Sequence, residues 1–92
     1  MPVTVRIPTQ LRPLTNGSPE IALQSGKLSE VLGELGTVYP ELKTRIFDDD
    51  GKLRRFINIF VSDEDIRFLD GLDTEVTDQS VVSIVPAVAG GF

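Results

Sequence analysis

The 92-residue sequence predicts an α+β domain in which one main helix packs across a mixed sheet of about four to five strands. Two observations predict this class. Apolar and polar residues alternate over residues 3–8, which is the two-residue period of a half-buried strand, and a second strand-like apolar segment lies at residues 81–85. Between these segments, over residues 28–39, apolar residues recur at the spacing of one helix face.

The first two strands are expected to pair as a hairpin. Residues 3–7 alternate apolar and polar side chains, as in a strand with one buried face. Asn16-Gly17 then predicts a turn, because asparagine and glycine tolerate positive φ. Residues 21–23 give the second, shorter strand after a generous loop.

The main helix is expected to begin near Lys27, with Ser25 as a candidate cap, and to end at Pro40. Gly33 and Gly36 each cost about 1 kcal/mol of helix propensity relative to alanine. Tertiary packing of the apolar face must therefore hold this helix. The residues on that face are Leu28, Val31, Leu32, Leu35 and Tyr39.

Three more strands are predicted in the second half of the chain. They cover residues 56–61, 66–69 and 81–85, and Pro86 stops the last one. The acidic segment Asp48-Asp49-Asp50-Gly51 before them predicts a solvated turn, because its spacing does not supply the ligands of an EF-hand calcium loop.

The composition excludes several classes of function. The chain has no cysteine and no histidine, which removes disulfides, thiolate metal sites, thiol nucleophiles and the usual general base at neutral pH. A cluster-binding ferredoxin is excluded for the same reason. Only paired carboxylates such as Asp63 and Asp65 remain as candidates for hydrolytic chemistry.

The charge and the hydropathy pattern favour an acidic cytoplasmic protein. The net charge of −5 disfavours nucleic-acid binding and suits contact with basic protein surfaces. No apolar run is long enough for a membrane span, and no targeting segment is recognisable near the N-terminus. We therefore expect a cytoplasmic location without membrane or nucleic-acid partners.

The sequence after Pro86 reads Ala87-Val88-Ala89-Gly90-Gly91-Phe92. Two adjacent glycines lose the most entropy when ordered, so a frayed terminus is the simplest interpretation. A Gly-Gly segment is also thin enough to enter a narrow channel and carry a carboxylate to the α-phosphate of a nucleotide. We therefore expect a domain over residues 1–86 and a flexible tail over residues 87–92.

With these features the whole chain resembles the ThiS/MoaD-like sulfur carriers of the ubiquitin-like β-grasp fold. The similarity is greatest to the thiocarboxylate carrier of cysteine biosynthesis. The residues that carry the resemblance lie in four runs: residues 3–9, 52–61, 63–68 and 86–91. The resemblance implies a ubiquitin-like β-grasp sheet with its helix across one face.

The resemblance also implies a chemistry centred on Gly91. An E1-like adenylating and sulfurtransferase enzyme would activate the Gly91 carboxylate with ATP, and sulfur would replace AMP to give a thiocarboxylate. Val88, Ala89 and Gly90 would thread the tail into that enzyme. A pyridoxal-phosphate-dependent cysteine synthase would accept the sulfur, and a zinc metallohydrolase would release the product. ATP, pyridoxal phosphate and zinc belong to these partners, so the chain is a co-substrate and not an enzyme.

Phe92 departs from the family pattern, whose working form ends on the second glycine. The expectation is that Gly91-Phe92 is a processing site, cleaved by a metallohydrolase of the kind that frees cysteine. The alternative is that Phe92 is permanent and that the chain is a degenerate or purely binding member.

Phe60, Phe68 and Val85 are candidates for a partner-binding surface, because the other apolar rows of their segments can fill the core. Arg54, Arg55 and Arg67 are candidates for pairing with acids of a partner. Two other functions stay open: a ubiquitin-like modifier conjugated to lysines, and a non-covalent β-grasp interaction module. The sequence leaves the sulfur-consuming pathway and the oligomeric state open.

Overall fold

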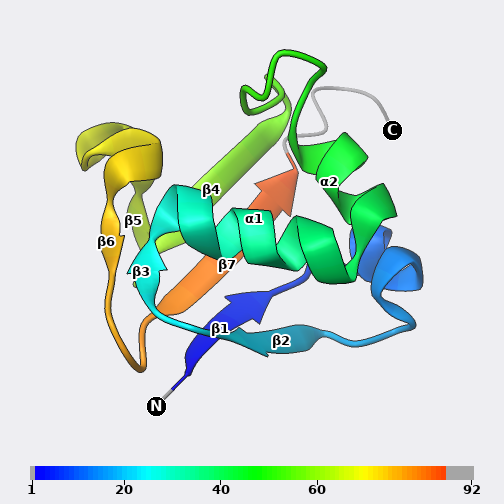
Figure 1. The fold of residues 1–92 in the computed structure, drawn as a ribbon, viewed down its shortest axis with the longest axis horizontal. Helices are drawn as coiled ribbons and strands as arrows, with labels where there is room; N and C mark the ends of the chain where they lie inside the picture. The colour runs from blue at the N-terminus through cyan, green and yellow to red at the C-terminus, as the bar shows by residue number, and fades with distance from the viewer. Residues whose placement is uncertain (1, 87–92) are drawn as a thin grey trace.

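The computed structural model describes residues 2–86, and its ribbon is shown in Figure 1. A five-stranded sheet has the order β2-β1-β7-β4-β5, and a small two-stranded sheet pairs β3 with β6. The strands are β1 (Val3–Arg6), β2 (Glu20–Leu23), β3 (Gly26–Lys27), β4 (Ile57–Val61), β5 (Glu64–Asp65), β6 (Glu75–Val76) and β7 (Val81–Pro86). The helices are α1 (Leu28–Val38) and α2 (Pro40–Ile46), with 3₁₀ turns η1 (Thr9–Thr15), η2 (Ile66–Phe68) and η3 (Gly71–Asp73).

The main sheet is mixed, as predicted. The two central strands β1 and β7 run parallel, while β2, β4 and β5 each pair antiparallel with a neighbour. The predicted β1–β2 hairpin is confirmed, and its turn contains Asn16 and Gly17 at φ 57° and 85°. The connection also contains η1, which the prolines at its start and middle had hidden from the sequence pattern.

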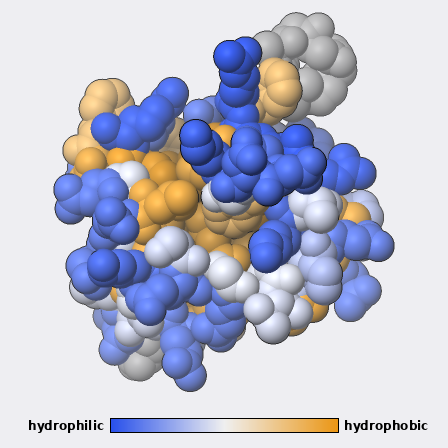
Figure 2. All heavy atoms as spheres, turned by 45° about the horizontal axis from the view of Figure 1, so that its top comes forward, coloured by the Kyte–Doolittle hydropathy of each residue, from blue (hydrophilic) through white to orange (hydrophobic). Residues whose placement is uncertain are grey.

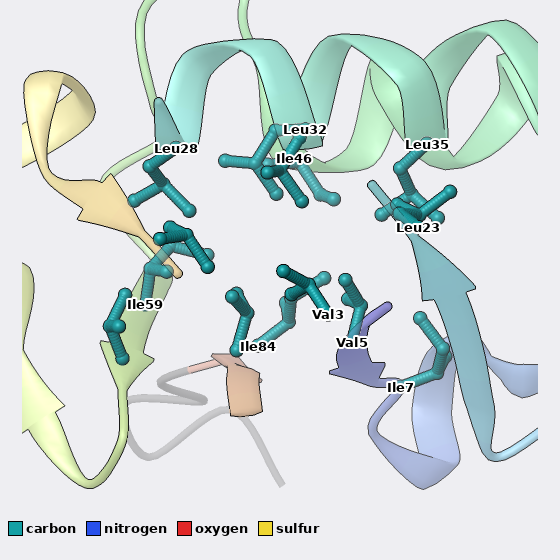
Figure 3. Packing of buried hydrophobic residues seen from close by; sticks show 14 of the residues in the cluster. Val3, Val5, Ile7, Leu23, Leu28, Leu32, Leu35, Ile46, Ile59 and Ile84 are labelled. Atoms are coloured by element: carbon teal, nitrogen blue, oxygen red, sulfur yellow. The ribbon is translucent and has the colours of Figure 1, made fainter. Parts of the chain in front are cut away.

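The core lies between α1 and one face of the sheet. Figure 3 shows side chains of α1 pointing toward those of the sheet, with Leu28, Leu32 and Leu35 on the helix side. Val3 and Val5 of β1 are fully buried beneath them. Burial of this apolar surface offsets the low helix propensity of the two glycines in α1.

The start of α1 differs from the expectation for Ser25. Lys27 occupies the N-cap position, and its backbone N–H donates to the Glu30 carboxylate over 2.9 Å. Ser25 lies two residues before that cap and makes no capping bond. Because a carboxylate in the first turn also interacts favourably with the helix dipole, Glu30 supplies the start signal that Ser25 was expected to give.

The prediction that the main helix ends at Pro40 is confirmed, because α1 stops at Val38, but a second helix that the sequence pattern did not predict follows directly. Pro40 is the first residue of α2, where its fixed φ and missing N–H are tolerated. Leu42 and Ile46 of α2 are buried in the same core. The sequence pattern missed α2 because seven residues are too short to show a helical period.

The prediction of a strand over residues 66–69 was wrong, because Ile66–Phe68 form the 3₁₀ turn η2. The chain turns sharply at Ser62 and Asp63, both at positive φ, and only Glu64–Asp65 pair with β4. Phe68 therefore lies in η2, beyond the edge of the sheet.

Two smaller boundaries differ from the predictions, and one turn is confirmed. β4 begins at Ile57, which leaves Phe56 in an exposed turn, and β7 includes Pro86, which pairs with Ile57. The acidic turn after α2 is confirmed: the Asp48 carboxylate accepts hydrogen bonds from the backbone amides of Asp50 and Lys52.

Candidate functional site

The first part of the candidate site is the end of β7 at Pro86, which directly precedes residues 87–91 in the sequence. β7 is the central strand, and it is held on one side by β1 and on the other by β4. The fold therefore gives the start of residues 87–92 a rigid base at Pro86. The residues predicted to thread and react, Val88, Ala89, Gly90, Gly91 and Phe92, lie outside the described residues, so those roles stay predictions.

A hollow of about 390 Å³ lies beside this base, between the ends of β1 and β7 and the start of η1. Arg6 and Arg12 line it together with Pro86. The Arg12 Nε donates to the Ile7 carbonyl over 3.1 Å, and Arg6 lies 3.6 Å from the Glu20 carboxylate. Arg6 and Arg12 thus line the hollow next to Pro86 in a chain whose net charge is negative.

Sequence reasoning missed both of these arginines. In the sequence Arg6 is one polar member of the strand alternation, and no local signal distinguishes it from other solvated residues. Its place near the end of β7 follows from the parallel pairing of Arg6 with Ser83. That pairing joins the two ends of the chain and cannot be deduced from either segment alone.

The second part of the candidate site is the face of the sheet opposite α1. Phe60 pairs with Ser83 and Asn58 pairs with Val85, so Phe60 and Val85 are diagonal neighbours on one face. Val85 is 42% exposed, while Phe60 is half-buried. The structure therefore brings together two of the three predicted partner-binding residues.

Phe68, the third of these residues, lies apart from that pair. It is 85% exposed and belongs to η2, which follows the edge strand β5. Such exposure of a phenylalanine fits a contact residue, but Phe68 lies beyond the edge strand and not beside Phe60 and Val85.

Asp63 and Asp65 do not form a pair suited to acid–base chemistry. The Arg67 guanidinium donates to both oxygens of Asp65, with the shortest contact at 2.7 Å, and the Arg67 backbone amide donates to the same carboxylate. These hydrogen bonds hold the pKa of Asp65 below its usual range. Asp63 lies in the exposed hairpin turn. Asp65 is therefore a structural group that fixes η2 against the edge of the sheet.

The Asp65–Arg67 pair predicts a specific loss of stability in acid. Because the pKa of Asp65 is lower in the folded than in the unfolded chain, its contribution is full above the ordinary value of 3.8 and is lost as the pH falls through the folded value. The Asp65→Asn variant should show a smaller drop in urea midpoint between pH 7 and pH 3 than the parent chain. Asp63→Asn is the matched control and should keep the parental drop. An equal drop in all three chains would contradict this role.

Other sites are scarce in the part of the chain that the structure describes. No group of three or more aspartate or glutamate residues there is arranged to hold a metal ion. None of the helices in this part is both long and apolar enough to cross a membrane. Another hollow, of about 540 Å³, lies between β2 and α1 and has a mainly polar lining that includes Glu34 and Asp78.

Comparison with known proteins defines the family. The model of the ThiS family matches residues 5–91. This chain belongs to the ThiS family. Its match runs from the first strand through Gly91, so the ThiS pattern includes the Gly90-Gly91 segment as well as the domain.

Individual relatives agree with membership of the ThiS family. Sulfur carrier protein CysO of Mycobacterium tuberculosis is 46% identical over 93 aligned residues, which cover 99% of this chain and 100% of that protein. A chain in the crystal structure of the Amycolatopsis orientalis BexX/CysO complex superposes with a TM-score of 0.88 at 42% identity, covering 97% of this chain and 99% of that one. The solution structure of small archaeal modifier protein 1 from Methanosarcina acetivorans gives a TM-score of 0.84 at 36% identity, covering 98% and 96%. The predicted ubiquitin-like β-grasp fold is confirmed.

Proposed function

We propose that this chain is a sulfur carrier whose Gly91 carboxylate is adenylated and then converted to a thiocarboxylate. One observation carries the proposal: the ThiS family match extends through residue 91 and so includes the domain and the Gly90-Gly91 segment together. The names of the relatives add support, since a chain 46% identical to this one is a sulfur carrier protein.

The geometry of the described residues suits a co-substrate. A carrier needs a rigid base for its tail and a face that a larger enzyme can recognise. Pro86 ends a central strand, and the outer face offers Phe60 and Val85 next to that strand end. We propose that these side chains, with Phe68 beyond the edge strand, dock on the activating enzyme while the tail enters its nucleotide site.

The partners supply the catalytic groups in this proposal. An E1-like enzyme joins the Gly91 carboxylate to AMP with release of pyrophosphate from ATP, and a sulfur nucleophile then displaces AMP. A pyridoxal-phosphate-dependent cysteine synthase consumes the sulfur, and a zinc metallohydrolase frees the cysteine. Similarity to CysO favours the cysteine pathway.

A protein modifier is the second candidate function. Its support is the 36% identity and the TM-score of 0.84 to a small archaeal modifier protein. A modifier would use the same activated Gly91, but a lysine amine in place of a sulfur nucleophile would attack it. The two functions therefore differ in the acceptor and not in the site on this chain.

Intact-mass spectrometry tests the proposal directly. The chain ending at Gly91 is incubated with an E1-like adenylating enzyme, ATP and sulfide, and the expected product carries one sulfur in place of one oxygen. Omitting ATP should abolish the mass gain. A chain that forms lysine conjugates without gaining sulfur would support the modifier instead, and a chain that does neither would contradict both covalent functions.

A further inference from the structure

The edge of the main sheet beside β4 is incompletely paired. β5 pairs only with Phe60 and Val61, so within residues 2–86 no strand covers Ile57, Asn58 and Ile59 on that side. The exposed edge of a β-strand is a template for another extended segment.

The register shows which backbone groups face this edge. The Ser62 amide donates to the Val81 carbonyl over 2.8 Å, and alternate residues of an antiparallel pair bond to the same neighbour. Phe60 and Asn58 therefore bond to β7, while Ile57 and Ile59 direct their backbone groups away from it. The Ile57 amide already donates to the Arg54 carbonyl, which leaves the Ile57 carbonyl and the Ile59 amide facing outward.

A groove follows this open edge, and we call it the β4 groove. It has a volume of about 310 Å³ and lies between β4, the segment before it and η2. In Figure 2, which tilts the top of Figure 1 toward the viewer, hydrophobic surface lies in a recess bordered by hydrophilic residues. The apolar lining residues are Leu53, Ile57, Ile59 and Ile66.

The side chains that line the β4 groove carry a net positive charge, whereas the net charge of the whole chain is negative. Three arginines line the groove, against the single carboxylate of Asp65, and the chain has a net charge of −5. Arg67 is held by Asp65, and the Arg54 Nε donates to the Thr44 carbonyl. No carboxylate within residues 2–86 pairs with Arg55. An apolar groove with a basic rim is thus built into one edge of an acidic protein.

We propose that the β4 groove binds an extended acidic peptide segment of a partner protein, in which branched aliphatic residues are flanked by aspartate or glutamate. The segment adds to β4 as a further strand, and its backbone bonds to the Ile57 carbonyl and the Ile59 amide. Its aliphatic side chains enter the groove and its carboxylates lie against Arg54, Arg55 and Arg67. This docking site does not depend on sulfur transfer or on the residues after Pro86.

Two other occupants fit less well. A second copy of the chain would bring two proteins of net charge −5 together, which opposes association. The chain's own segment 87–92 is apolar and contains no acidic side chain, so it supplies only its terminal carboxylate against three arginines. Charge complementarity therefore selects an acidic partner.

A titration of the isotope-labelled full chain tests the proposal. The probe is an acetylated and amidated peptide, Asp-Glu-Ile-Val-Ile-Asp-Glu, and the readout is the amide resonances. Saturable shifts are expected at Ile57 and Ile59, with affinity falling as salt is added. The same peptide with lysine in place of every acid should bind at least about tenfold more weakly, because it meets three like charges.

Matched charge-reversal variants locate the contact. Arg55→Glu should weaken binding about fivefold, whereas Lys52→Glu, an equal charge change outside the groove lining, should change it less than about twofold. Retained dispersion of the amide spectrum verifies that each variant is folded. The proposal is overturned by equal binding of the lysine peptide, by shifts centred on Val85, or by equal effects of the two variants. Groove shifts that follow protein concentration alone, or displacement of the 87–92 resonances by the peptide, would instead identify a second copy or the tail as the occupant and also overturn it.

Discussion

The chain that ends at Gly91 should gain sulfur at least about 100-fold faster than the chain that continues through Phe92. With Phe92 present, the free carboxylate belongs to another residue and carries a benzyl side chain beside it. The five residues from 87 to 91 span at most about 18 Å when fully extended, and one more residue adds about 3.5 Å. A reacting carboxylate displaced by that length cannot occupy the same position at a nucleotide α-phosphate. Intact mass after timed incubation with an E1-like enzyme, ATP and sulfide measures the ratio.

A variant of equal length separates the two causes of this block. Phe92→Gly keeps the extra residue but removes the ring. If the displaced carboxylate causes the slow reaction, Phe92→Gly should gain sulfur as slowly as the parent chain. If the bulk of the Phe92 ring causes it, Phe92→Gly should gain sulfur nearly as fast as the chain that ends at Gly91. Equal rates for all three chains would show that residues after Gly91 do not mask it, which would remove the need for a processing enzyme.

The parts of the fold that follow from short-range pattern were predictable from the sequence. Alternation over residues 3–7, the apolar run over residues 81–85 and the helical face of Leu28 and Leu35 predicted elements that the structure confirms. Their arrangement into a β-grasp sheet came only from the family resemblance. Periodicity does not state which strands are neighbours, and the central pairing of β1 with β7 joins opposite ends of the chain.

The wrong or missing predictions share a physical cause: the elements concerned are too short to show a period in the sequence. η2 and β5 contain three and two residues, too few for any period to show, so the apolar residues around Phe68 predict a strand that does not form. Likewise, α2 was hidden behind Pro40. The same limit applies to the candidate site. The outer-face pair Phe60 and Val85 could be proposed from the sequence, but the arginine-lined hollow beside Pro86 and the open edge of β4 depend on register.

Gly36 has a structural role that depends on α2, the short helix that the sequence did not predict. From the sequence, Gly33 and Gly36 both cost helix stability to the same degree. In the structure they differ: a Cβ at Gly33 would meet nothing within 4 Å, whereas a Cβ at Gly36 would lie 3.0 Å from the Cβ of Lys43 on α2. The Lys43 Cβ is fixed to the backbone and cannot swing away as the end of a flexible side chain would. Gly36 therefore permits the close approach of α1 and α2.

We accordingly expect Gly36→Val to lower the free energy of unfolding by about 2 kcal/mol, because overpacking outweighs a propensity gain of about 0.4 kcal/mol. For a domain of this size, that corresponds to a fall in Tm of roughly 10 °C. Gly33→Val is the matched control and should change stability by less than about 0.5 kcal/mol, since the same propensity gain there meets open space. Thermal unfolding followed by circular dichroism measures both.

A double-mutant cycle identifies the contact that makes the difference. Lys43→Gly removes the opposing Cβ at a helix-propensity cost of about 1 kcal/mol. In that background Gly36→Val should lose most of its effect, giving a coupling free energy of about 1 kcal/mol or more, within the range for residues in direct contact. Additive effects would mean that α1 and α2 separate freely. The helix that the sequence pattern missed would then have no part in fixing the position of α1 over the sheet.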